Sequence, residues 1–228
     1  MSNENNQLKE WKNEFGKTYT DRNNMTVEEM NSLYKINYGI TRTELNNEFL
    51  KDFDKRIRIL EVGSNVGNQL LCLQNMGFVN LYGLEPQLYA VELSKKNTKS
   101  INIIEGNAFD IPFKDNYFDL VFTSGVLIHI NPENINKAID EIYRCSNSYI
   151  WGFEYFIPVG YEMIQYRGKE ELLWKTDFSK LYLDRFPDLR MIKKKIVKYT
   201  NSKNEDIMYL LRKDRKSTRL NSSHVSES

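Results

Sequence analysis

The sequence is poor in the residues that build cross-linked, metal-bound or exported proteins. It has two cysteines and two histidines among 228 residues. Neither Cys72 nor Cys145 has a C-x-x-C partner or a neighbouring histidine, so no disulfide framework and no metal site are predicted. The N-terminus lacks the apolar stretch of an export signal, and no run approaches the roughly 18 apolar residues of a membrane span. These absences predict a reduced, cytoplasmic protein that does not cross a membrane.

An excess of charge of either sign is also missing. The chain has 32 basic and 31 acidic side chains. Residues 214–228 hold three of the basic and two of the acidic ones, so 29 of each are left without them. Binding to nucleic acid or to an anionic membrane surface is therefore not expected. The Lys193-Lys194-Lys195 run is interpreted as a solvated face.

The last fifteen residues are set apart from the fold. The stretch 214–224 back-translates codon by codon into a common short-read sequencing adapter, which indicates a gene fragment read through into library DNA. A disordered native tail, rich in serine, asparagine and arginine, is the alternative. The other 213 residues suffice for one α/β domain with a sizeable core.

Short β-branched runs alternate with helical patterns in the middle of the chain. Strands are predicted at 57–62, 80–84, 101–105, 117–124 and 149–153, and helices at 66–76, 88–96 and from 131 onward. Two more strands, 189–199 and 206–211, flank the polar turn 200–204 as a hairpin. The pattern predicts an α/β fold: a doubly wound, mostly parallel seven-stranded Rossmann-like sheet with an antiparallel hairpin at one edge.

The segment before the first strand is predicted to be helical. Thr26 and Thr41 each precede a glutamate by three residues, as in a capping box, and Gly39 separates the two helices. Gly16 and the polar stretch 21–24 are expected to break any long helix near the N-terminus. Residues 1–56 are predicted to form a strap or lid on domain 57–213, with simple anchoring as the alternative. An aromatic-rich insert at about 154–185 is expected to contribute to the substrate site.

Glycines and acids follow the first two strands. Gly63 and Gly67 bracket a tight turn, where glycine permits a positive φ or a close backbone approach. Glu61 would repel a pyrophosphate, and the spacing departs from the dinucleotide pattern G-x-G-x-x-G. Glu85 ends the second strand, where a carboxylate can hold a ribose. The unit therefore predicts a nucleoside-type ligand at the carboxyl edge of the sheet.

Three motifs resemble those of class I S-adenosylmethionine-dependent methyltransferases. The stretch from Glu61 to Gly67 resembles E/D-x-G-x-G-x-G, with Asn65 at the middle glycine, and asparagine tolerates left-handed φ. Residues 106–113 resemble the G-D-A-x-x-L-P-F loop, and residues 118–121 resemble the F-D-x-V strand. The resemblance covers about residues 57–155. It implies S-adenosylmethionine as cofactor and methyl transfer as the reaction.

The resemblance implies particular cofactor contacts. It gives Glu85 the two ribose hydroxyls and places Asn107 and Ala108 beside the adenine, with the Asn107 oxygen accepting from the adenine amino group. Tyr19 and Arg22 are expected to close over the cofactor, with Arg22 meeting its methionine carboxylate. The full predicted set is Tyr19, Arg22, Glu61, Gly63, Ser64, Asn65, Gly67, Glu85, Pro86, Asn107, Ala108, Phe109, Thr123 and Ser124.

The flanks look like a narrower group, the bacterial pseudaminic acid biosynthesis-associated methylases. This similarity implies a role near surface-glycan assembly and a small, sugar-type substrate. It says less about the reaction, because the group's name records gene neighbourhood. The matching stretches are Trp11, Phe15-Gly16, 19–23, 125–132, 143–146, Glu154-Tyr155, 166–168 and 186–189.

Catalytic candidates follow the fourth and fifth strands. His129, after the fourth strand, is placed to take a proton from an acceptor hydroxyl or amine, or else caps or packs beneath the site. Glu154 is a candidate base or a ligand for a substrate hydroxyl, with a structural pairing to a cation such as Arg167 as the alternative. Tyr155 joins them at the same edge. Tyr166 and Arg167 are the substrate candidates: Arg167 would fork onto a carboxylate or phosphate, or form a salt bridge within the insert.

The sequence thus predicts an O- or N-methyltransferase, and two other classes stay open. A nucleotide-cofactor oxidoreductase is disfavoured by the missing G-x-G-x-x-G and by the loop 106–113. A non-catalytic module would bind the cofactor without methyl transfer. The acceptor atom and the oligomeric state are not predicted.

Overall fold

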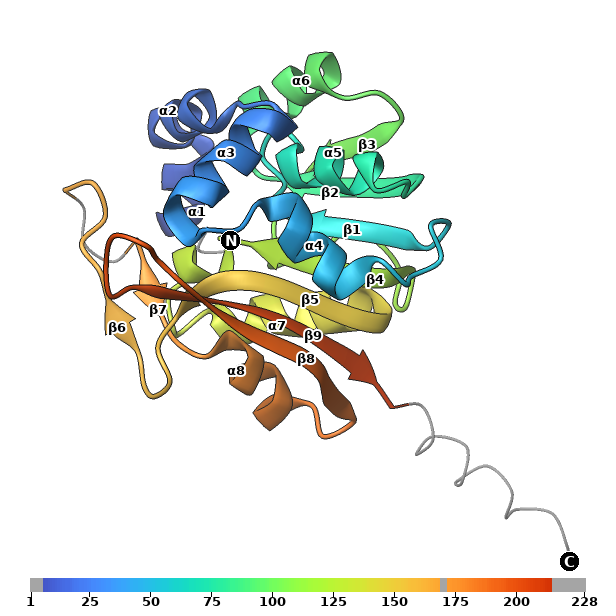
Figure 1. The fold of residues 1–228 in the computed structure, drawn as a ribbon, viewed down its shortest axis with the longest axis vertical. Coiled ribbons are helices and arrows are strands. Elements are labelled where there is room, and N and C mark those ends of the chain that lie inside the picture. The colour runs from blue at the N-terminus through green and yellow to red at the C-terminus, as the bar shows by residue number, and fades with distance from the viewer. Residues whose placement is uncertain (1–5, 169–171, 215–228) are drawn as a thin grey trace, which may run out of the picture.

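Seven strands form one twisted sheet in the computed structural model, which describes residues 6–168 and 172–214. The spatial order is β3-β2-β1-β4-β5-β9-β8 (Figure 1). β1 to β5 are parallel, and β9 runs antiparallel to both β5 and β8. This confirms the predicted fold class. The strands are β1 (Arg58–Val62), β2 (Asn80–Glu85), β3 (Ile101–Glu105), β4 (Phe118–Ser124), β5 (Ser146–Phe156), β8 (Leu189–Lys198) and β9 (Glu205–Lys213).

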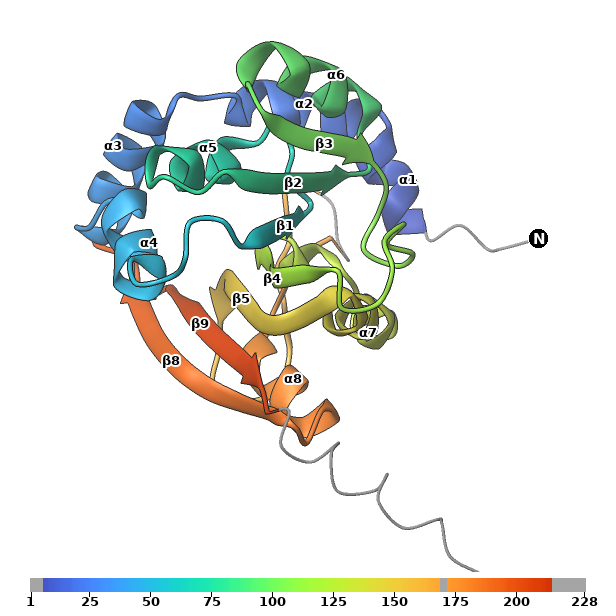
Figure 2. The same cartoon turned by 90° about the vertical axis from the view of Figure 1, so that its right-hand side faces the viewer.

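Helices cover both faces of the sheet. Figure 2 shows α4 (Arg42–Leu50) and α5 (Asn68–Asn75) on one side and α7 (Ile135–Cys145) on the other, where α8 (Phe178–Arg185) joins it. Each face of the sheet has its own hydrophobic core, and alternate residues of a strand belong to different cores because their side chains point to opposite faces. Ile59 packs with α4 and α5, whereas Leu60 packs with α7. α6 (Leu88–Asn97) packs against β2 and β3.

The N-terminal helices lie at the carboxyl ends of the parallel strands (Figure 1). They are α1 (Asn6–Lys12), α2 (Glu14–Asn23) and α3 (Val27–Tyr38). Both predicted capping boxes, at Thr26 and Thr41, are present, and Gly39 ends α3 in the left-handed conformation. β1 and β4 are neighbours in the sheet, but the strand that follows β1 lies on one side of the pair and the strand that follows β4 lies on the other. The strand order therefore reverses between β1 and β4, and this switch point lies beneath the N-terminal helices.

Three local predictions were wrong. Gly16 does not break a helix: it lies inside α2, where a Cβ would come within 1.8 Å of the Trp11 carbonyl oxygen. α7 begins at Ile135 and not at residue 131, although the Asn131 side chain accepts from the Asn134 amide (2.9 Å) as the predicted cap would. β5 extends well beyond 149–153, because β9 pairs with it from Tyr149 to Phe156.

The insert adds a small antiparallel sheet of β6 (Glu162–Met163) and β7 (Trp174–Lys175) before α8. Its residues 169–171 are outside the described ranges, as are residues 215–228, so the prediction about the tail is untested. Among the described residues, no helix combines the length and the apolar character needed to span a membrane.

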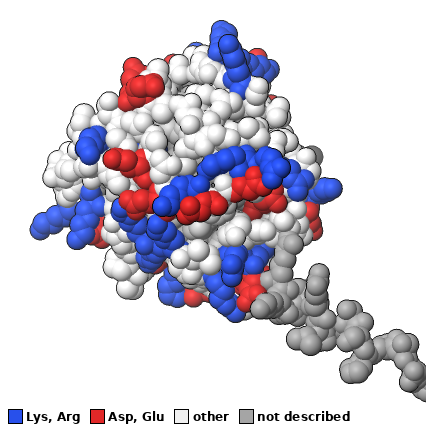
Figure 3. Space-filling model, turned by 45° about the vertical axis from the view of Figure 1, so that its right-hand side comes forward, with Lys and Arg blue, Asp and Glu red and all other residues white. Residues whose placement is uncertain are grey.

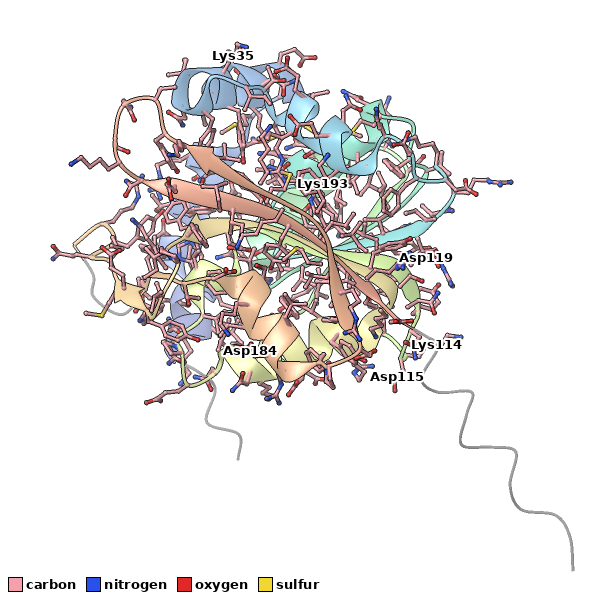
Figure 4. All side chains as sticks on the ribbon, turned by 60° about the horizontal axis from the view of Figure 1, so that its bottom comes forward. Lys35, Lys114, Asp115, Asp119, Asp184 and Lys193 are labelled. Atoms are coloured by element: carbon pink, nitrogen blue, oxygen red, sulfur yellow. The ribbon has the colours of Figure 1, made fainter. Side chains whose placement is uncertain are left out.

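Charged side chains of both signs are intermixed on the face in Figure 3. Lys193 of β8, labelled in Figure 4, donates to the Glu48 carbonyl (2.6 Å), and Lys194 pairs with Asp177 (3.0 Å). The lysine run therefore lies on an exposed edge strand, where such charges oppose edge-to-edge pairing. Asp119, also labelled in Figure 4, accepts from the Arg58 amide (2.8 Å) and so ties the starts of β1 and β4 together.

Candidate active site

A cavity of about 380 Å³ lies at the carboxyl edge of the sheet. Its walls come from the ends of β1, β2, β4 and β5, from the loop after β3, and from α1, α2 and α3. A pocket of this size suits a small molecule. The predicted residues that line it are Tyr19, Glu61, Gly63, Ser64, Asn65, Glu85, Pro86, Asn107, Ala108, Phe109, Ser124, His129, Glu154, Tyr155 and Tyr166.

The loop after β1 takes three left-handed residues in close succession. Gly63, Asn65 and Gly67 have φ of 75°, 47° and 89°. A Cβ on Gly63 would come within 2.5 Å of a Val126 methyl group, so a close approach as well as the dihedral requires glycine there. Asn65 thus occupies the conformation that the sequence motif assigns to a glycine.

Glu85 holds this loop to the end of β2. Its Oε2 accepts from the Asn65 amide (2.8 Å), and its Oε1 accepts from the Gln87 amide (2.9 Å). Burial raises the pKa of Glu85 to about 7, although both amides oppose the shift. Each oxygen keeps a second lone pair, so the carboxylate can still accept from hydroxyls in the cavity.

Two polar side-chain atoms of the loop after β1, as the structure describes it, have no hydrogen-bond partner. The Ser64 hydroxyl and the Asn65 side-chain oxygen are buried and unbonded, and both residues line the cavity. Buried polar atoms are costly without hydrogen bonds, so these two favour a polar ligand. The Asn107 oxygen accepts from the Phe109 amide (2.9 Å), which leaves it one lone pair for the predicted adenine contact.

His129 lies at the end of a short 3-10 helix, η1 (Leu127–His129). Its Nδ1 is 2.7 Å from the Leu172 carbonyl oxygen. Since a carbonyl only accepts, Nδ1 carries the proton and Nε2 has the free lone pair. Burial lowers the pKa of His129 to about 4, so the ring is neutral at physiological pH. The indole of Trp11 packs 4.6 Å from the imidazole.

Glu154 caps the same loop. Its Oε2 accepts from the amides of Val126 (3.0 Å) and Ile128 (3.4 Å), and burial raises its pKa to about 7. These contacts hold the backbone that carries His129. The pairing to Arg167 that the sequence left open is not formed among the described contacts, and Arg167 is exposed.

The two sequence comparisons agree on one domain type. A family model described as "Methyltransferase domain" matches residues 60–148. An uncharacterized methyltransferase from Staphylococcus carnosus is 31% identical over 132 residues, which cover 58% of this chain and 57% of that protein. The chain therefore spans little more than half of that relative's length.

Solved structures share the fold at low identity. The PH0226 protein from Pyrococcus horikoshii superimposes with a TM-score of 0.65 at 18% identity, covering 86% of this chain and 95% of that one. A Burkholderia thailandensis 1,6-didemethyltoxoflavin-N1-methyltransferase, solved with S-adenosylhomocysteine, gives a TM-score of 0.60 at 11% identity, covering 75% and 76%.

Residues 60–148 thus match a methyltransferase domain, within the Rossmann-like methyltransferase fold. Its cofactor is S-adenosylmethionine, and the cavity of this methyltransferase domain fits that molecule. The left-handed loop after β1 brings its backbone close to the cavity, and Glu85 can accept hydrogen bonds from ribose hydroxyls. The buried Ser64 hydroxyl and Asn65 oxygen have no hydrogen-bond partner within the chain, so a ligand can supply one. Among the described residues, no lysine or arginine lines the cavity, which suits a cationic sulfonium.

Four predicted residues do not reach the cavity of the methyltransferase domain. Arg22 and Arg167 are exposed and lie beside the rings of Tyr19 and Tyr166 respectively. Gly67 begins α5, where a Cβ would come within 2.8 Å of Ile103. Thr123 is buried in β4, where its side chain hydrogen-bonds Glu154.

The methyltransferase cavity also includes residues that the sequence did not indicate. Asp206 and Tyr199 come from the β8–β9 hairpin, and Tyr38 comes from the end of α3. The sequence could have indicated Asp206, because it is an acid at the start of a strand predicted to be antiparallel. The amino end of an antiparallel strand lies beside the carboxyl ends of the parallel strands, so this acid was bound to lie near the site. No local pattern marks Tyr38.

Proposed function

We propose that the chain transfers the methyl group of S-adenosylmethionine to a hydroxyl or amine of a small, sugar-type molecule. The observation that carries this proposal is the shared cavity. The glycine loop and Glu85 form one part of it, and the neutral His129 opens onto the same space. When bound, the cofactor supplies an electrophilic methyl group, so the protein's task is alignment and acceptor deprotonation.

Nε2 of His129 is the proposed proton acceptor. It is unprotonated at neutral pH and its ring is fixed by Leu172 and Trp11. A positioned base contributes about 10²–10⁴-fold, whereas alignment alone is worth roughly 7–11 kcal/mol of barrier. Glu154 acts as a positioning residue, because its carboxylate is engaged by the amides of the loop that leads to His129.

Aromatic side chains support the sugar-type acceptor. Tyr155 and Tyr166 line the cavity on the side of β5 and the insert, where they can cover a sugar face. The proposal extends to surface-glycan assembly in a bacterial cytoplasm, on the strength of the sequence resemblance and of two free, buried cysteines. Tyr19, which packs 6.5 Å from His129, would close the cofactor end.

Transfer of a tritiated methyl group tests the proposal. The purified chain is incubated with labelled S-adenosylmethionine and a panel of nucleotide-activated nonulosonate and amino-sugar intermediates. Label is expected in at least one sugar. Cofactor binding without transfer to any acceptor, unchanged when His129 is substituted, would contradict the proposal and favour a non-catalytic module.

A further inference from the structure

A second polar group lies at the β5–β9 end of the cavity, away from the glycine loop. Asp206 of β9 pairs in register with Tyr155 of β5 and lines the cavity. The Tyr38 hydroxyl donates to its Oδ2 (2.6 Å), and the Tyr199 hydroxyl lies 3.3 Å from the same atom. Asp206 is 1% exposed, and its Oδ1 has no hydrogen-bond partner. One carboxylate oxygen is therefore held and the other is unsatisfied.

Aromatic rings surround this carboxyl. The Tyr38 ring lies 4.6 Å from Tyr199 and 5.1 Å from Tyr34. Phe153 lies 5.7 Å from Tyr34 and 5.9 Å from Tyr38. All four residues line the cavity. A carboxyl set among aromatic faces is an arrangement that attracts ammonium groups, through charge pairing and through the ring quadrupoles.

The β5–β9 end of the cavity has no lysine or arginine in its described lining that could pair with an anionic group. The described lining of the whole cavity includes four carboxyl side chains, which are Glu61, Glu85, Glu154 and Asp206. Arg42 is buried behind the wall, where it donates to Tyr34 (2.9 Å), Asn46 (2.8 Å) and Ser124 (3.1 Å). Its guanidinium faces the rings of Tyr34 and Phe153, at 5.5 Å and 4.8 Å from the ring centroids. Lys175 donates to Asn204 (2.8 Å). Burial raises the pKa of Asp206 to about 7, although both cations act to lower it.

We propose that Asp206 and the rings of Tyr38 and Tyr199 form a subsite for an ammonium group of the methyl acceptor. This rests on the proposed function and narrows it: the acceptor bears an amino or ammonium group. The subsite is distinct from the cofactor region, because β4 and β5 lie between β1 and β9 in the sheet. A phosphate or carboxylate placed here would face the carboxylate of Asp206, and no lysine or arginine is in the described lining of the cavity.

Choline and its uncharged isostere 3,3-dimethyl-1-butanol probe the subsite, since the two molecules differ in charge and hardly in shape. Each is titrated calorimetrically into wild-type chain at about pH 8, above the pKa of Asp206, with and without saturating S-adenosylhomocysteine. Choline is expected to bind about tenfold more tightly than the isostere. Equal affinities in the wild-type chain would overturn the proposal without need of any variant.

The variant Asp206→Asn tests whether the preference for choline over its uncharged isostere depends on the carboxylate of Asp206. The variant is expected to lose the preference for choline, while its affinity for S-adenosylhomocysteine stays within about twofold of wild type. Glu205→Gln is the matched control: it removes one charge from the adjacent residue, which pairs with Lys198 (3.5 Å), and should keep the preference. A preference that survives Asp206→Asn would contradict the assignment. Failure of S-adenosylhomocysteine to bind the wild-type chain contradicts only the proposed function, because the titrations without it still report on the subsite.

Discussion

Asn65 shows how one residue of the cofactor loop departs from its motif without changing the backbone. Its φ of 47° lies in the left-handed region, which costs a non-glycine residue roughly 1–2 kcal/mol. The amide that it turns toward Glu85 forms a 2.8 Å hydrogen bond, which offsets part of this cost. Asparagine is among the few residues that adopt this conformation readily.

Gly63→Ala is expected to weaken S-adenosylhomocysteine binding by about tenfold or more, because the new methyl group would collide with Val126. Asn65→Gly is the matched variant in the same loop, and its affinity should stay within about threefold of wild type. Calorimetric titration measures both. Equal losses in the two variants would show that the left-handed loop does not shape the binding site.

Protonation of His129 should lower the reaction rate at acidic pH. Its pKa of about 4 means that the base form persists down to acidic pH and is lost only as the pH falls through about 4. The acid limb that belongs to His129 is therefore expected below about pH 5, apart from any limb near pH 7, where Glu85, Glu154 and Asp206 titrate. His129→Ala should lower kcat by about 10²–10⁴-fold and should remove the limb below pH 5. Full activity in the variant, or a limb below pH 5 that survives in it, would contradict the assigned role.

At the scale of elements, α1 and α2 form a strap over the cavity. The Gln87 side chain donates to the carbonyls of Trp11 (3.1 Å) and Asn13 (2.9 Å). The Asn131 amide donates to the side chain of Gln7 (3.0 Å). Aromatic contacts add to these hydrogen bonds: Trp11 packs on His129 and Phe15 packs on Tyr166.

Trp11→Ala is expected to speed the dissociation of S-adenosylhomocysteine by about fivefold or more, because the indole packs on His129 inside the cavity. Lys9→Ala, on the exposed side of α1, is the control and should leave the rate unchanged. Stopped-flow displacement measures both rates. An unchanged rate in the tryptophan variant would mean that the strap anchors the domain without gating the cavity.

The sequence predicted the elements that local chemistry determines. Capping boxes at Thr26 and Thr41 and the turn at Gly63 depend on neighbouring residues, and all were found. What escaped prediction depends on contacts between distant segments. The pairing of β5 with β9 extends β5 to Phe156 and places Asp206 in the cavity.

At the scale of the whole molecule, four buried carboxyls should make stability depend on pH. Burial raises the pKa values of Glu85, Glu154 and Asp206 to about 7 and raises the pKa of Glu61 well above its ordinary value. The folded state then binds more protons than the unfolded state, so stability is highest below the unfolded pKa and is lost as the pH rises through about 7. His129 opposes this trend only below its ordinary pKa of about 6.5.

The free energy of unfolding is therefore expected to fall between about pH 6.5 and pH 8, each carboxyl contributing on the order of 1 kcal/mol or less. Urea denaturation at the two pH values measures it. Glu154→Gln should show a smaller fall than wild type, because one titrating group is gone. A free energy of unfolding that rises over this interval would contradict the burial of these groups as acids.

Calorimetric titration of the wild-type chain with S-adenosylmethionine, and in parallel with NADP⁺, tests the central claim most directly. S-adenosylmethionine is predicted to bind with one-to-one stoichiometry and to lose about tenfold or more in affinity in Glu85→Ala, since that carboxylate is the proposed ribose ligand. NADP⁺ is predicted to give no binding heat. Binding of NADP⁺ alone, or S-adenosylmethionine binding that is unaffected in Glu85→Ala, would contradict the assignment of this cavity.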